Sequence, residues 1–516
     1  MTSLWLASAS HTAPGGERLA TEPVGGRYDV AVVGAGLTGL ATAVLLARAG
    51  LSVVVLEARY VGAGTTGHST AKVSLLQGTR MSAIERQHGP EVLGKYVAGN
   101  RLGQEWLLAE CARHDVQVQR RAAVTYAAGP QQLPAARAEH EAALSAGLPV
   151  EWRESFDAPF PALDGTWLPE QAQVDPVDVL GALVLEAEAA GVIVRTAARV
   201  TDAHGRDGAV VTTRGTVHAE RVVLATGIPF ADRGGYFARL EPQRSYSLAL
   251  AVPEPTGLQM SITAGAPTRS VRTVPAEEGE IVIVGGASHV VGRADSPRAR
   301  VENLLTWARR WFPDSRVVAR WSAQDYHPVD ELPYVGPLLP RDSRALVATG
   351  FAKWGMTNAV AAAHMLTGYL TDDLPEWSDA YRSWRRREMI GLAEAVRLNA
   401  GVAAQLAGGY ARALTNPEPA GRAEPDDVPE TTAETLPDDD TPAEGMGCVV
   451  RRGLHPVAVS TVDGVTRTVS AVCPHLGGVV RWNDEERSWD CPLHGSRFAA
   501  DGELLEGPAT RGLPPR

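Results

Sequence analysis

The sequence is short of cysteine and of long apolar runs, and each shortage excludes a class of protein. Four cysteines among 516 residues are too few for a disulfide framework, so reduced thiols or metal ligands fit them better. No stretch reaches the roughly 18 apolar residues that a membrane-spanning helix needs. The N-terminus lacks the basic start and the apolar core of a secretory signal. We therefore expect a globular protein of the cytoplasm.

Lysine is also scarce, because only Lys72, Lys95 and Lys353 stand beside 46 arginines. The run Arg385–Arg387 indicates a solvated helix face, with a docking patch as the alternative.

The formal net charge is −11, but residues 416–445 hold ten acids and one arginine and so carry −9 of it. The acidity therefore argues only weakly against nucleic-acid partners. The same stretch is rich in Pro, Asp, Glu and Thr, which predicts a flexible linker that would let the region after it move.

Residues 28–59 have the pattern of a strand, a tight glycine turn, a helix and a second strand. Gly34, Gly36 and Gly39 form G-x-G-x-x-G after an apolar run, where side chains would obstruct the turn, the approach of a pyrophosphate and helix–strand packing. The helix N-terminus offers free N–H groups to phosphates. Glu57 lies 18 residues after Gly39, at the end of the second strand, where an acid can bind ribose hydroxyls. The stretch predicts a dinucleotide site and leaves NAD and FAD open.

The order of expected elements predicts an α/β protein of about three domains. A mostly β pattern interrupts an α/β pattern that resumes later, which indicates two interleaved domains. We expect a Rossmann-like nucleotide-binding part at 27–125, 170–235 and 330–375, and a β-sheet substrate cap at 126–169 and 236–329. The remaining regions are an extended lead-in at 1–26, a helical extension at 376–415, the linker at 416–445 and a small all-β domain at 446–516.

This arrangement resembles the D-amino-acid-oxidase-like FAD oxidoreductases, a family that includes glycine, sarcosine and dimethylglycine oxidases. The resemblance covers residues 27–375 and rests on the first fingerprint, on the Ala-Thr-Gly turn at 225–227 and on GFAKWGMT at 350–357. It implies FAD as the cofactor. The FAD-binding residues that it implies are Gly34, Gly36, Thr38, Gly39, Glu57, Thr65, Thr66, His68, Val200, Thr226, Gly227, Gly350, Lys353, Trp354, Gly355 and Met356.

Lys353 stands just before a helix that we expect to begin near Gly355. Hydride transfer to a flavin leaves negative charge on the N1–C2 carbonyl edge of the ring, and a helix N-terminus aimed there would stabilise that charge. Lys353 would add a full positive charge; a surface lysine at a helix start is the alternative. His68 occupies the position where dimethylglycine-oxidase-like sequences carry a histidine bonded to the flavin. Its neighbours Gly67 and Ser69 depart from that pattern, so we expect a hydrogen-bonding histidine instead.

Candidate catalytic residues besides Lys353 lie on expected strands of the cap. Arg244 would bind a substrate carboxylate in a bidentate pair, and Tyr246 or Tyr326 would line the amine. Gln324 is a further candidate, as is Asp330; polar residues on a solvent-facing strand are the alternative for all of them. No second G-x-G-x-x-G follows a strand and opens a helix. We therefore expect no NAD(P)H site, and the electrons should come from the substrate.

The clearest metal signal is a pair of short motifs, Cys473-Pro-His475 and Cys491-Pro-Leu-His494. Zinc fingers pair cysteine with cysteine and histidine with histidine along the chain, whereas each of these motifs supplies one of each. A Rieske [2Fe-2S] cluster needs that alternation, with the two cysteines on one iron and the two histidines on the other. The motifs therefore predict a Rieske cluster, and a structural zinc is the alternative.

The tail from 446 to about 510 resembles the Rieske domain that is fused to D-amino-acid-oxidase-like flavoproteins. Those domains usually carry a second cysteine in each loop, bridged to one another, at the positions of Gly478 and Leu493. Both are absent here, so packing alone must hold the loops. A ring-hydroxylating oxygenase would need a further large domain with mononuclear iron, and only 18 residues follow Phe498. We do not expect that class.

These features predict an FAD-dependent enzyme that oxidises the C–N bond of an amine or amino acid. Electrons would pass from the flavin to the Rieske cluster and on to an external acceptor such as a ferredoxin, a quinone or a cytochrome. An oxidase that uses O₂ and keeps the cluster for structure is one alternative. A non-catalytic electron-transfer or redox-sensing flavoprotein is another. The oligomeric state and the substrate are left open.

The residues around the expected cluster predict its reduction potential. Ser496 can bond a cluster sulfide, but Phe498 stands where high-potential relatives have a tyrosine whose hydroxyl supports a cysteine ligand. Fewer hydrogen bonds stabilise the reduced cluster less. We predict a potential in the lower half of the range of roughly −150 to +300 mV that Rieske centres span. A redox titration followed by cluster absorbance measures it, and a value near that of the respiratory Rieske proteins contradicts the prediction.

Overall fold

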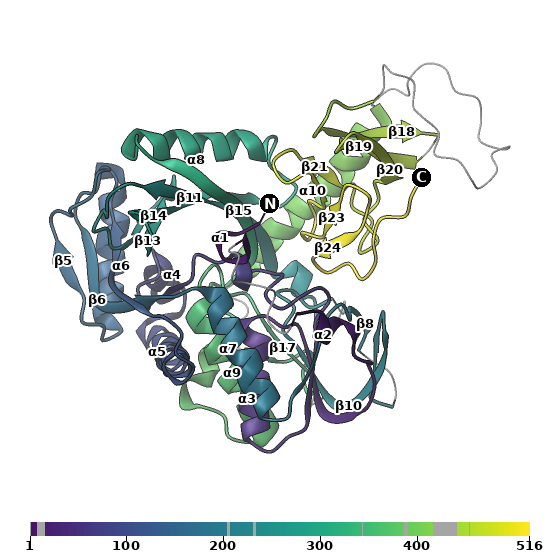
Figure 1. The fold of residues 1–516 in the computed structure, drawn as a ribbon, viewed down its shortest axis with the longest axis horizontal. Coiled ribbons are helices and arrows are strands. Elements are labelled where there is room, and N and C mark those ends of the chain that lie inside the picture. The colour runs from purple at the N-terminus through teal and green to yellow at the C-terminus, as the bar shows by residue number, and fades with distance from the viewer. Residues whose placement is uncertain are drawn as a thin grey trace. The chain divides into compact units, whose positions relative to one another are not determined.

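The computed structural model divides the chain into two compact units, which are described separately (Figure 1). The first comprises Met1–Ser288 and Val301–Ala395, and the second comprises His289–Arg300 and Val396–Arg516. The structure describes residues 2–7, 16–203, 207–230, 234–342, 344–385, 391–415, 441–453 and 455–516. Most of the predicted linker lies outside the described residues.

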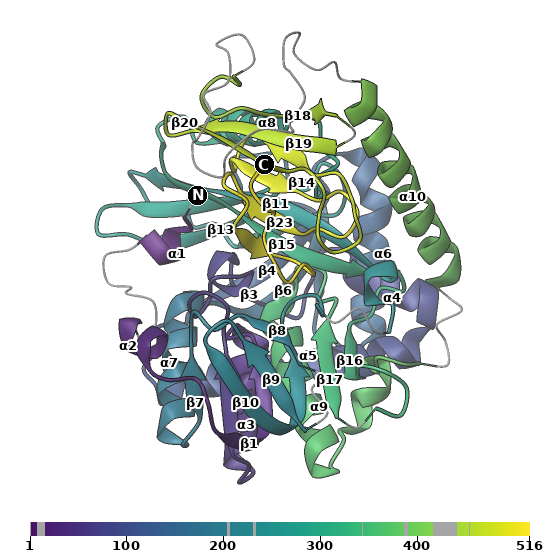
Figure 2. The ribbon, with the colours of Figure 1, turned by 90° about the vertical axis from the view of Figure 1, so that its right-hand side faces the viewer.

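The first sheet of the first unit carries the parallel α/β pattern that the glycine fingerprint predicts (Figure 2). Its strand order is β16-β17-β10-β1-β2-β7, with β8 and β9 beyond β10. All neighbours from β17 to β7 pair in parallel, and β16 is antiparallel to β17. The strands are β1 (Arg27–Val33), β2 (Val53–Leu56), β7 (Ile193–Arg195), β8 (Val200–Asp202), β9 (Ala209–Thr212), β10 (Gly215–Leu224), β16 (Tyr334–Pro337) and β17 (Ala345–Thr349).

Three helices cover one face of this sheet: α3 (Leu37–Arg48), α7 (Pro176–Ala189) and α9 (Gly355–Thr371). Parallel strands need a crossover, and α3 supplies the one between β1 and β2. Because α7 and α9 flank α3, that helix is buried on nearly all sides (Figure 1). Its apolar sequence LTGLATAVLLAR is therefore that of a core helix rather than of an amphipathic surface helix.

The second sheet of the first unit has the order β15-β11-β14-β13-β12-β4-β6-β3, with β5 beside β6. One face packs under α8 (Pro297–Trp311), where Val284, Val301 and Leu304 share a core. The strands are β3 (Lys72–Val73), β4 (Gln119–Tyr126), β5 (Glu151–Arg153), β6 (Gly165–Gln173), β11 (Leu240–Val252), β12 (Met260–Thr263), β13 (Ser270–Pro275), β14 (Glu280–Val290) and β15 (Arg316–Pro328). The helices α4 (Arg80–His88), α5 (Pro90–Arg113) and α6 (Leu133–Ser145) complete this region.

The structure differs from the sequence-based division at several points. Strands β3 and β4 belong to the cap sheet, although their residues fall within the range 27–125 that was assigned to nucleotide binding. The expected extended lead-in contains two short helices, α1 (Leu4–Ala7) and α2 (Gly16–Thr21). Trp5 explains why α1 is ordered, because its indole is buried and its Nε1 donates to the carbonyl of Ser69 at 2.8 Å. The end of α4 is set by Gly89, whose φ of 82° favours glycine.

The second unit is built mainly from short antiparallel strands, as the sequence predicts. A three-stranded sheet has the order β18-β19-β20, and a four-stranded sheet has the order β21-β22-β23-β24. Most of the helix α10 (Leu392–Thr415) belongs to this unit, and so does the segment 289–300. The strands are β18 (Gly447–Arg452), β19 (His455–Val462), β20 (Val465–Ser470), β21 (Arg481–Asn483), β22 (Ser488–Asp490), β23 (Arg497–Ala499) and β24 (Leu504–Glu506). The expected helical extension at 376–415 is a 3₁₀ turn, η4 (Glu376–Ala380), followed by α10.

Among the described residues, no helix combines the length and the apolar character needed to cross a membrane.

Candidate functional site

The three fingerprint glycines hold the turn between β1 and α3 in the way that the motif predicts. Gly34 has a φ of 107°, and a Cβ there would lie 2.6 Å from the carbonyl oxygen of Ala225. A Cβ on Gly39 would lie 1.9 Å from the carbonyl oxygen of Gly34. Gly36 differs, because a Cβ there would meet only the hydroxyl of Thr66, at 3.2 Å. The Thr66 hydroxyl accepts the N–H of Leu37, the first residue of α3, at 3.2 Å. The space beside Gly36 is otherwise open, so the residues fit a bound pyrophosphate.

Glu57 is held at the end of β2 by two backbone donors. Its Oε2 accepts the N–H of Ala35 at 2.9 Å, and its Oε1 accepts the N–H of Arg59 at 2.9 Å. A carboxylate has about four lone-pair sites, so acceptor capacity is left for ribose hydroxyls. The segment that leads to Val200 lies alongside, because Ala198 donates its N–H to the Glu57 carbonyl at 2.8 Å. These residues fit the adenosine end of FAD.

The loop from Thr65 to His68 is tied to the cap strand β15. The Thr65 hydroxyl donates to the carbonyl of Gln324 at 2.5 Å, and the Trp321 indole donates to the carbonyl of His68 at 2.8 Å. The imidazole Nδ1 of His68 lies 2.8 Å from the carbonyl oxygen of Gly64. The hydrogen-bonding role predicted for His68 toward a flavin therefore stays a prediction.

The turn after β10 lies beside a candidate catalytic residue. The Thr226 hydroxyl donates to the carbonyl of Ile228 at 2.6 Å, and Gly227 has a φ of 78°. A Cβ on Gly227 would lie 3.4 Å from the ring of Tyr326. The structure therefore brings the Ala-Thr-Gly turn and Tyr326 together, as members of one site should be.

The loop before α9 is strained, and a carboxylate holds it. Gly350, Ala352 and Lys353 all have left-handed φ values, of 80°, 47° and 73°. Such backbone costs about 1–3 kcal/mol for each non-glycine residue and clusters at functional sites. The Asp325 carboxylate on β15 accepts the backbone N–H of Lys353. It also accepts the backbone N–H of the next residue in the strand, Tyr326, at 2.7 Å. The helix begins at Gly355, which confirms the predicted helix start.

Lys353 is a lysine with a perturbed ammonium group. Its Nζ donates to the Ser288 hydroxyl on β14. The side chain is exposed to solvent, but nearby protein atoms still desolvate the ammonium group. Desolvation lowers the pKa of Lys353 to about 8, although the Asp325 carboxylate opposes that effect. Burial in turn raises the pKa of Asp325.

Asp325 and Ser288 escaped the sequence analysis because neither belongs to a motif. The hydrogen-bond partners of Lys353 come from strands that are distant in sequence. A second lysine has a lowered pKa for the same reason but in other surroundings: burial lowers the pKa of Lys72 to about 7, and its Nζ donates to the Ser270 hydroxyl at 2.7 Å. The rarity of lysine was the available signal for Lys72, and the sequence analysis applied it to Lys353 alone.

Three of the candidate substrate-facing residues form one buried hydrogen-bonded chain. Arg244 donates from Nη1 to the Gln324 Oε1 at 3.2 Å, and Gln324 donates from Nε2 to the Tyr326 hydroxyl at 2.9 Å. Arg244 and Gln324 face each other directly in the pairing of β11 with β15. Tyr246 lies elsewhere, in the hydrophobic core under α8, and its side chain is 1% exposed. The structure thus assembles part of the predicted set and places Tyr246 in a packing role.

Two polar candidates have structural partners instead. Asp330 is buried and receives two bonds from Arg385, at 2.7 and 2.9 Å, so it supports the fold rather than facing a substrate. The prediction that Arg385 lies on a solvated face is therefore wrong, because the side chain is 7% exposed. Its sequence neighbours Arg386 and Arg387 lie outside the described residues.

The two cysteine–histidine motifs form closed loops in the second unit. Cys473 donates its N–H to the Gly478 carbonyl at 2.8 Å, and Cys491 donates its N–H to the Ser496 carbonyl at 2.8 Å. The rings of His475 and His494 lie 5.1 Å apart at an interplanar angle of 86°. Both cysteines are buried, and the described cysteines of the chain are free of disulfides. The structure thus brings the two cysteines together and the two histidines together, which are the two ligand pairs that a Rieske cluster requires.

The electrostatics of these loops also suit a metal cluster. A hydrogen bond from Cys491 lowers the pKa of Cys473 against the effect of burial, and the N–H of His475 adds to that effect. The same bond and burial raise the pKa of Cys491, so the proton of the pair stays on Cys491 until a metal displaces it. Burial lowers the pKa of His494 to about 3, so its imidazole is neutral at physiological pH. Thiolate and neutral imidazole are the ligand forms that bind metals.

A leucine fills the place of the disulfide that related domains carry. A Cβ on Gly478 would lie 2.6 Å from the Cγ of Leu493 and 3.0 Å from the Sγ of Cys491. Leu493 is buried in the same core as both cysteines. The two loops are therefore held by a large side chain packed on a glycine, which supports the expectation that packing replaces the covalent bridge.

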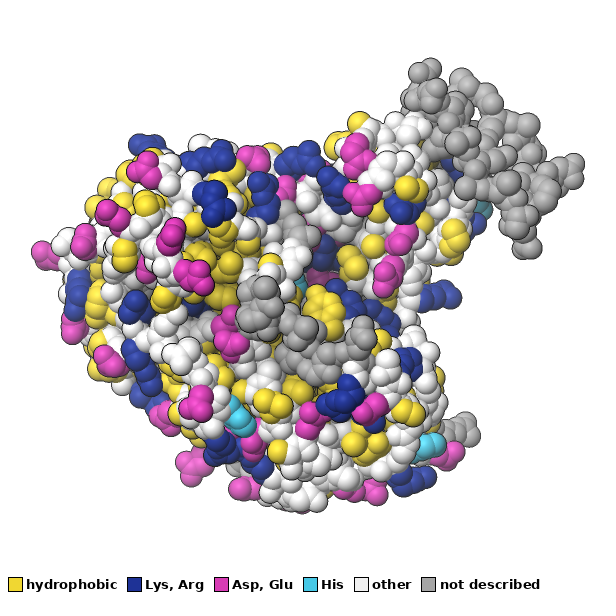
Figure 3. All heavy atoms as spheres, viewed as in Figure 1, with side chains coloured by type: hydrophobic (Ala, Val, Ile, Leu, Met, Phe, Trp, Pro, Cys, Tyr) yellow, Lys and Arg dark blue, Asp and Glu magenta, His cyan; other side chains and the backbone are white. Residues whose placement is uncertain are grey.

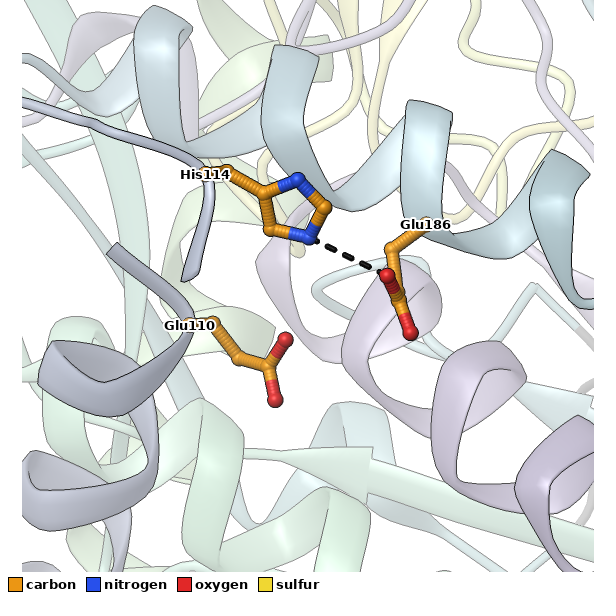
Figure 4. A group of neighbouring side chains, drawn as sticks. All are labelled: Glu110, His114 and Glu186. Carbon is orange, nitrogen blue, oxygen red and sulfur yellow. Dashed lines mark hydrogen bonds and ion pairs between the residues drawn. The ribbon is translucent and has the colours of Figure 1, made fainter. Parts of the chain in front are cut away.

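A further group of metal-ligand types, Glu110, His114 and Glu186, lies between α5 and α7 (Figure 4). Arg48 already holds both carboxylates, with bonds of 2.7 and 2.9 Å to Glu110 and 2.6 Å to Glu186. His114 lies 3.1 Å from Glu186. The acceptor atoms are used in an ion-pair network that ties α3, α5 and α7 together, so the group is structural.

Family models match both units. The model of the FAD dependent oxidoreductase family matches residues 29–369, and the model of the Rieske [2Fe-2S] domain matches residues 433–515. A Bacillus subtilis protein named as a Rieske 2Fe-2S iron-sulfur protein, YhfW, is 29% identical over 492 residues, which cover 94% of this chain and 92% of that protein. The tail alone is 53% identical over 45 residues to a cytochrome b6-f complex iron-sulfur subunit of Synechococcus, covering 9% of this chain and 26% of that subunit.

The first unit is similar to glycine oxidases. The glycine oxidase of Geobacillus kaustophilus is 27% identical over 368 residues, covering 68% of this chain and 93% of that enzyme. Its crystal structure superposes with a TM-score of 0.58 at 20% identity, over 70% of this chain and 99% of that one. An L-amino acid deaminase from Proteus myxofaciens has a TM-score of 0.55 at 18% identity, covering 69% of this chain and 93% of that one. These structures confirm the predicted fold class, and the family models confirm FAD and a [2Fe-2S] cluster as cofactors.

The charge on Lys353 generates a prediction about the bound flavin. Because the ammonium is present below pH 8 and is lost as pH rises through about 8, Lys353→Met should lower the flavin midpoint potential at pH 7. We expect a shift of about 30 mV, equivalent to about 1.4 kcal/mol for a two-electron couple. The shift should vanish by about pH 9. Lys353→Arg is the control, because arginine stays charged over this pH range. Its flavin midpoint potential should stay above that of Lys353→Met at both pH 7 and pH 9. If the flavin potentials of the unmodified protein and of Lys353→Met differ by the same amount at pH 7 and at pH 9, the assignment is contradicted.

The contact between Leu493 and Gly478 generates a second prediction. Leu493→Ala should leave a cavity and destabilise the second unit by about 2–4 kcal/mol, measured as earlier loss of cluster absorbance in urea. Gly478→Ala should destabilise it through the collision with Leu493. In the double variant the new methyl enters the space that the leucine vacates, so its loss should be smaller than the sum of the two. Strict additivity would show that the two residues do not support one another.

Proposed function

This chain belongs to the FAD dependent oxidoreductase family and carries a Rieske [2Fe-2S] domain. From that premise we propose that it oxidises the C–N bond of an amine or amino acid. We also propose that it passes the electrons to an external acceptor. When bound, FAD would supply two-electron hydride chemistry, and the cluster would supply one-electron transfer. The single observation that carries the proposal is that one chain holds both an open fingerprint turn at Gly36 and a convergent Cys₂His₂ pair of loops.

The electron balance of the proposed reaction is simple. The substrate loses a hydride from the carbon of its C–N bond and a proton from its nitrogen, and becomes an imine. Water then hydrolyses the imine to a carbonyl compound and an amine. The two electrons leave the protein one at a time, so each substrate molecule reduces two equivalents of a one-electron acceptor.

The described residues support this reaction through binding and charge. Arg244 is buried and donates to Gln324, and we assign it the substrate carboxylate, which suits the planar guanidinium group. Tyr326 lies beside the Gly227 turn, and we assign it the contact with the substrate amine. Lys353 and the N-terminus of α9 would supply positive charge to stabilise the negative charge of a reduced flavin. Tyr246 lies in the core under α8, and we give it no part in the reaction.

The cluster type bears on the external acceptor. Rieske centres lie at about −150 to +300 mV and plant-type ferredoxins near about −400 mV, so electron flow from this cluster to such a ferredoxin is unfavourable. A quinone or a cytochrome fits better among the acceptors that the sequence predicts. The similarity of the tail to a cytochrome b6-f complex iron-sulfur subunit covers 45 residues and does not identify the acceptor of this chain.

An anaerobic stopped-flow experiment tests the proposal. On mixing with a panel of glycine, sarcosine, dimethylglycine and other amines and amino acids, one class should bleach the flavin band, and the cluster band should bleach in a second phase. The matched control is Cys473→Ser, which removes one cluster ligand and should keep the first phase while losing the second. If a substrate reduces the flavin in both the unmodified protein and Cys473→Ser, and air reoxidises the two flavins equally fast, the result would favour the O₂-using oxidase. No bleaching by any amine would favour the non-catalytic redox protein.

A further inference from the structure

The backbone carbonyls of residues 67–71, five in a row, are all bound by buried side chains from other parts of the first unit. They belong to the loop that carries His68 and leads into β3. The donors and the carbonyls that they bind are Ser3 to Gly67 at 2.6 Å, Trp321 to His68 at 2.8 Å, Trp5 to Ser69 at 2.8 Å, and Arg272 to Thr70 at 2.6 Å and to Ala71 at 3.3 Å. Loops usually leave such groups to water, so the backbone of this one is unusually constrained.

Two of these donors come from the short helix α1 and the residue before it. The Ser3 hydroxyl also accepts the N–H of Leu6 at 3.2 Å, so the group that binds the loop also caps the start of α1. Trp5 packs in a core with Trp321, and the guanidinium carbon of Arg272 lies 5.2 Å from the centroid of the Trp5 ring. α1 lies against β15, the strand that carries Trp321 (Figure 1).

The burial of Ser3 and Trp5 distinguishes this segment from an ordinary stretch of surface. Apolar, acidic and basic side chains are mixed over the molecular face drawn in Figure 3, where they meet solvent. Ser3 is 0% exposed and Trp5 is 3% exposed, and each side chain donates its polar hydrogen to a loop carbonyl. Removal of either donor would leave its carbonyl without that bond, which is costly inside a protein.

The loop has backbone that needs this support. Gly67 is packed so closely that a Cβ there would lie 2.3 Å from the carbonyl oxygen of Gly62. Ala71 has a left-handed φ of 52° and donates its N–H to the Ser69 hydroxyl at 2.9 Å. Left-handed non-glycine residues persist only where their surroundings hold them, and they gather at functional sites. The bonds from Arg272 help to hold this one.

The other end of the loop reaches the fingerprint turn. The Thr66 hydroxyl accepts the N–H of Leu37, and a Cβ on Gly36 would lie 3.2 Å from that hydroxyl. The loop therefore borders the space that fits a pyrophosphate. The family model begins at residue 29, so Ser3 and Trp5 lie outside the region that it matches. A segment that precedes the matched region thus holds a loop that borders the nucleotide site.

We propose that residues 2–7 are part of the FAD site, with Ser3 and Trp5 as positioning residues that hold loop 65–71 in the conformation that binds FAD. The inference rests on the proposed function for assigning this loop to FAD. The two side chains act through the loop carbonyls and need no contact with the cofactor. A loop that is ordered during folding loses less conformational entropy when its ligand binds, so its ligand is held more tightly.

The test follows the release of FAD from the full-length protein, purified with both cofactors, by the rise in flavin fluorescence after dilution. Trp5→Phe keeps an aromatic ring in the core but removes the donor to Ser69, and it should raise the release rate about fivefold or more. Ser3→Ala removes the donor to Gly67 and should raise the rate about threefold, which decides the question if Trp5→Phe does not fold. Hydrogen exchange at the amides of residues 65–71 should quicken in both variants.

The matched control is Trp384→Phe, which removes an indole bond of 3.1 Å to the carbonyl of Pro337, outside loop 65–71. It should change the release rate less than twofold, with a loss of thermal stability similar to that of Trp5→Phe. Equal release rates in Trp5→Phe and Trp384→Phe would show that the N-terminal segment only stabilises the fold, and would overturn the proposal. FAD release that is equally slow in the unmodified protein, Trp5→Phe and Ser3→Ala also overturns it. No amine enters these measurements, so a failure of the proposed oxidation is a separate result.

Discussion

The hydrogen bond from the Lys353 backbone to the Asp325 carboxylate is the interaction on which the proposed oxidation site depends. It joins the loop before α9 to the cap strand β15, and so fixes two elements that are adjacent only in space. The loop contains two non-glycine residues in left-handed conformation, each costing about 1–3 kcal/mol. The half-buried Asp325 carboxylate, which accepts two backbone N–H groups, offsets part of that cost. The positions of Lys353, Tyr326 and the N-terminus of α9 follow from this one contact.

The second unit has a different constraint, which is steric rather than electrostatic. Leu493 occupies the space beside Gly478, and no bridge between the two cluster loops is possible at these positions. The loops must then be closed by backbone bonds and by packing of Leu493 against the buried cysteines. Dispersion contacts of a single buried leucine are individually weak and collectively large. The cluster itself, once bound, would add its own ligand bonds to this framework.

The sequence gives different amounts of information about the two sites because their residues are spaced differently along the chain. The fingerprint glycines and the Cys-x-His and Cys-x-x-His motifs act within one turn or loop, so their spacing alone predicts their geometry. Arg244 and Gln324 lie 80 residues apart, and only the pairing of β11 with β15 brings them together. The alternation of a strand places Arg244 and Tyr246 on one face. This alternation does not predict that α8 covers Tyr246 while Arg244 lies next to polar groups.

Local chemistry was therefore decided by the sequence: the nucleotide turn, the four predicted cluster ligands, the start of α9 and the absence of cysteines at the two loop positions. Each depends on residues whose mutual distance is limited by a few bonds of backbone. The tertiary structure decided which buried groups find partners. It pairs Arg385 with Asp330, places β3 and β4 in the cap sheet and lowers the pKa of Lys72 by burial. The physical reason is that burial and pairing depend on which distant strands meet, and that information is spread over the whole chain.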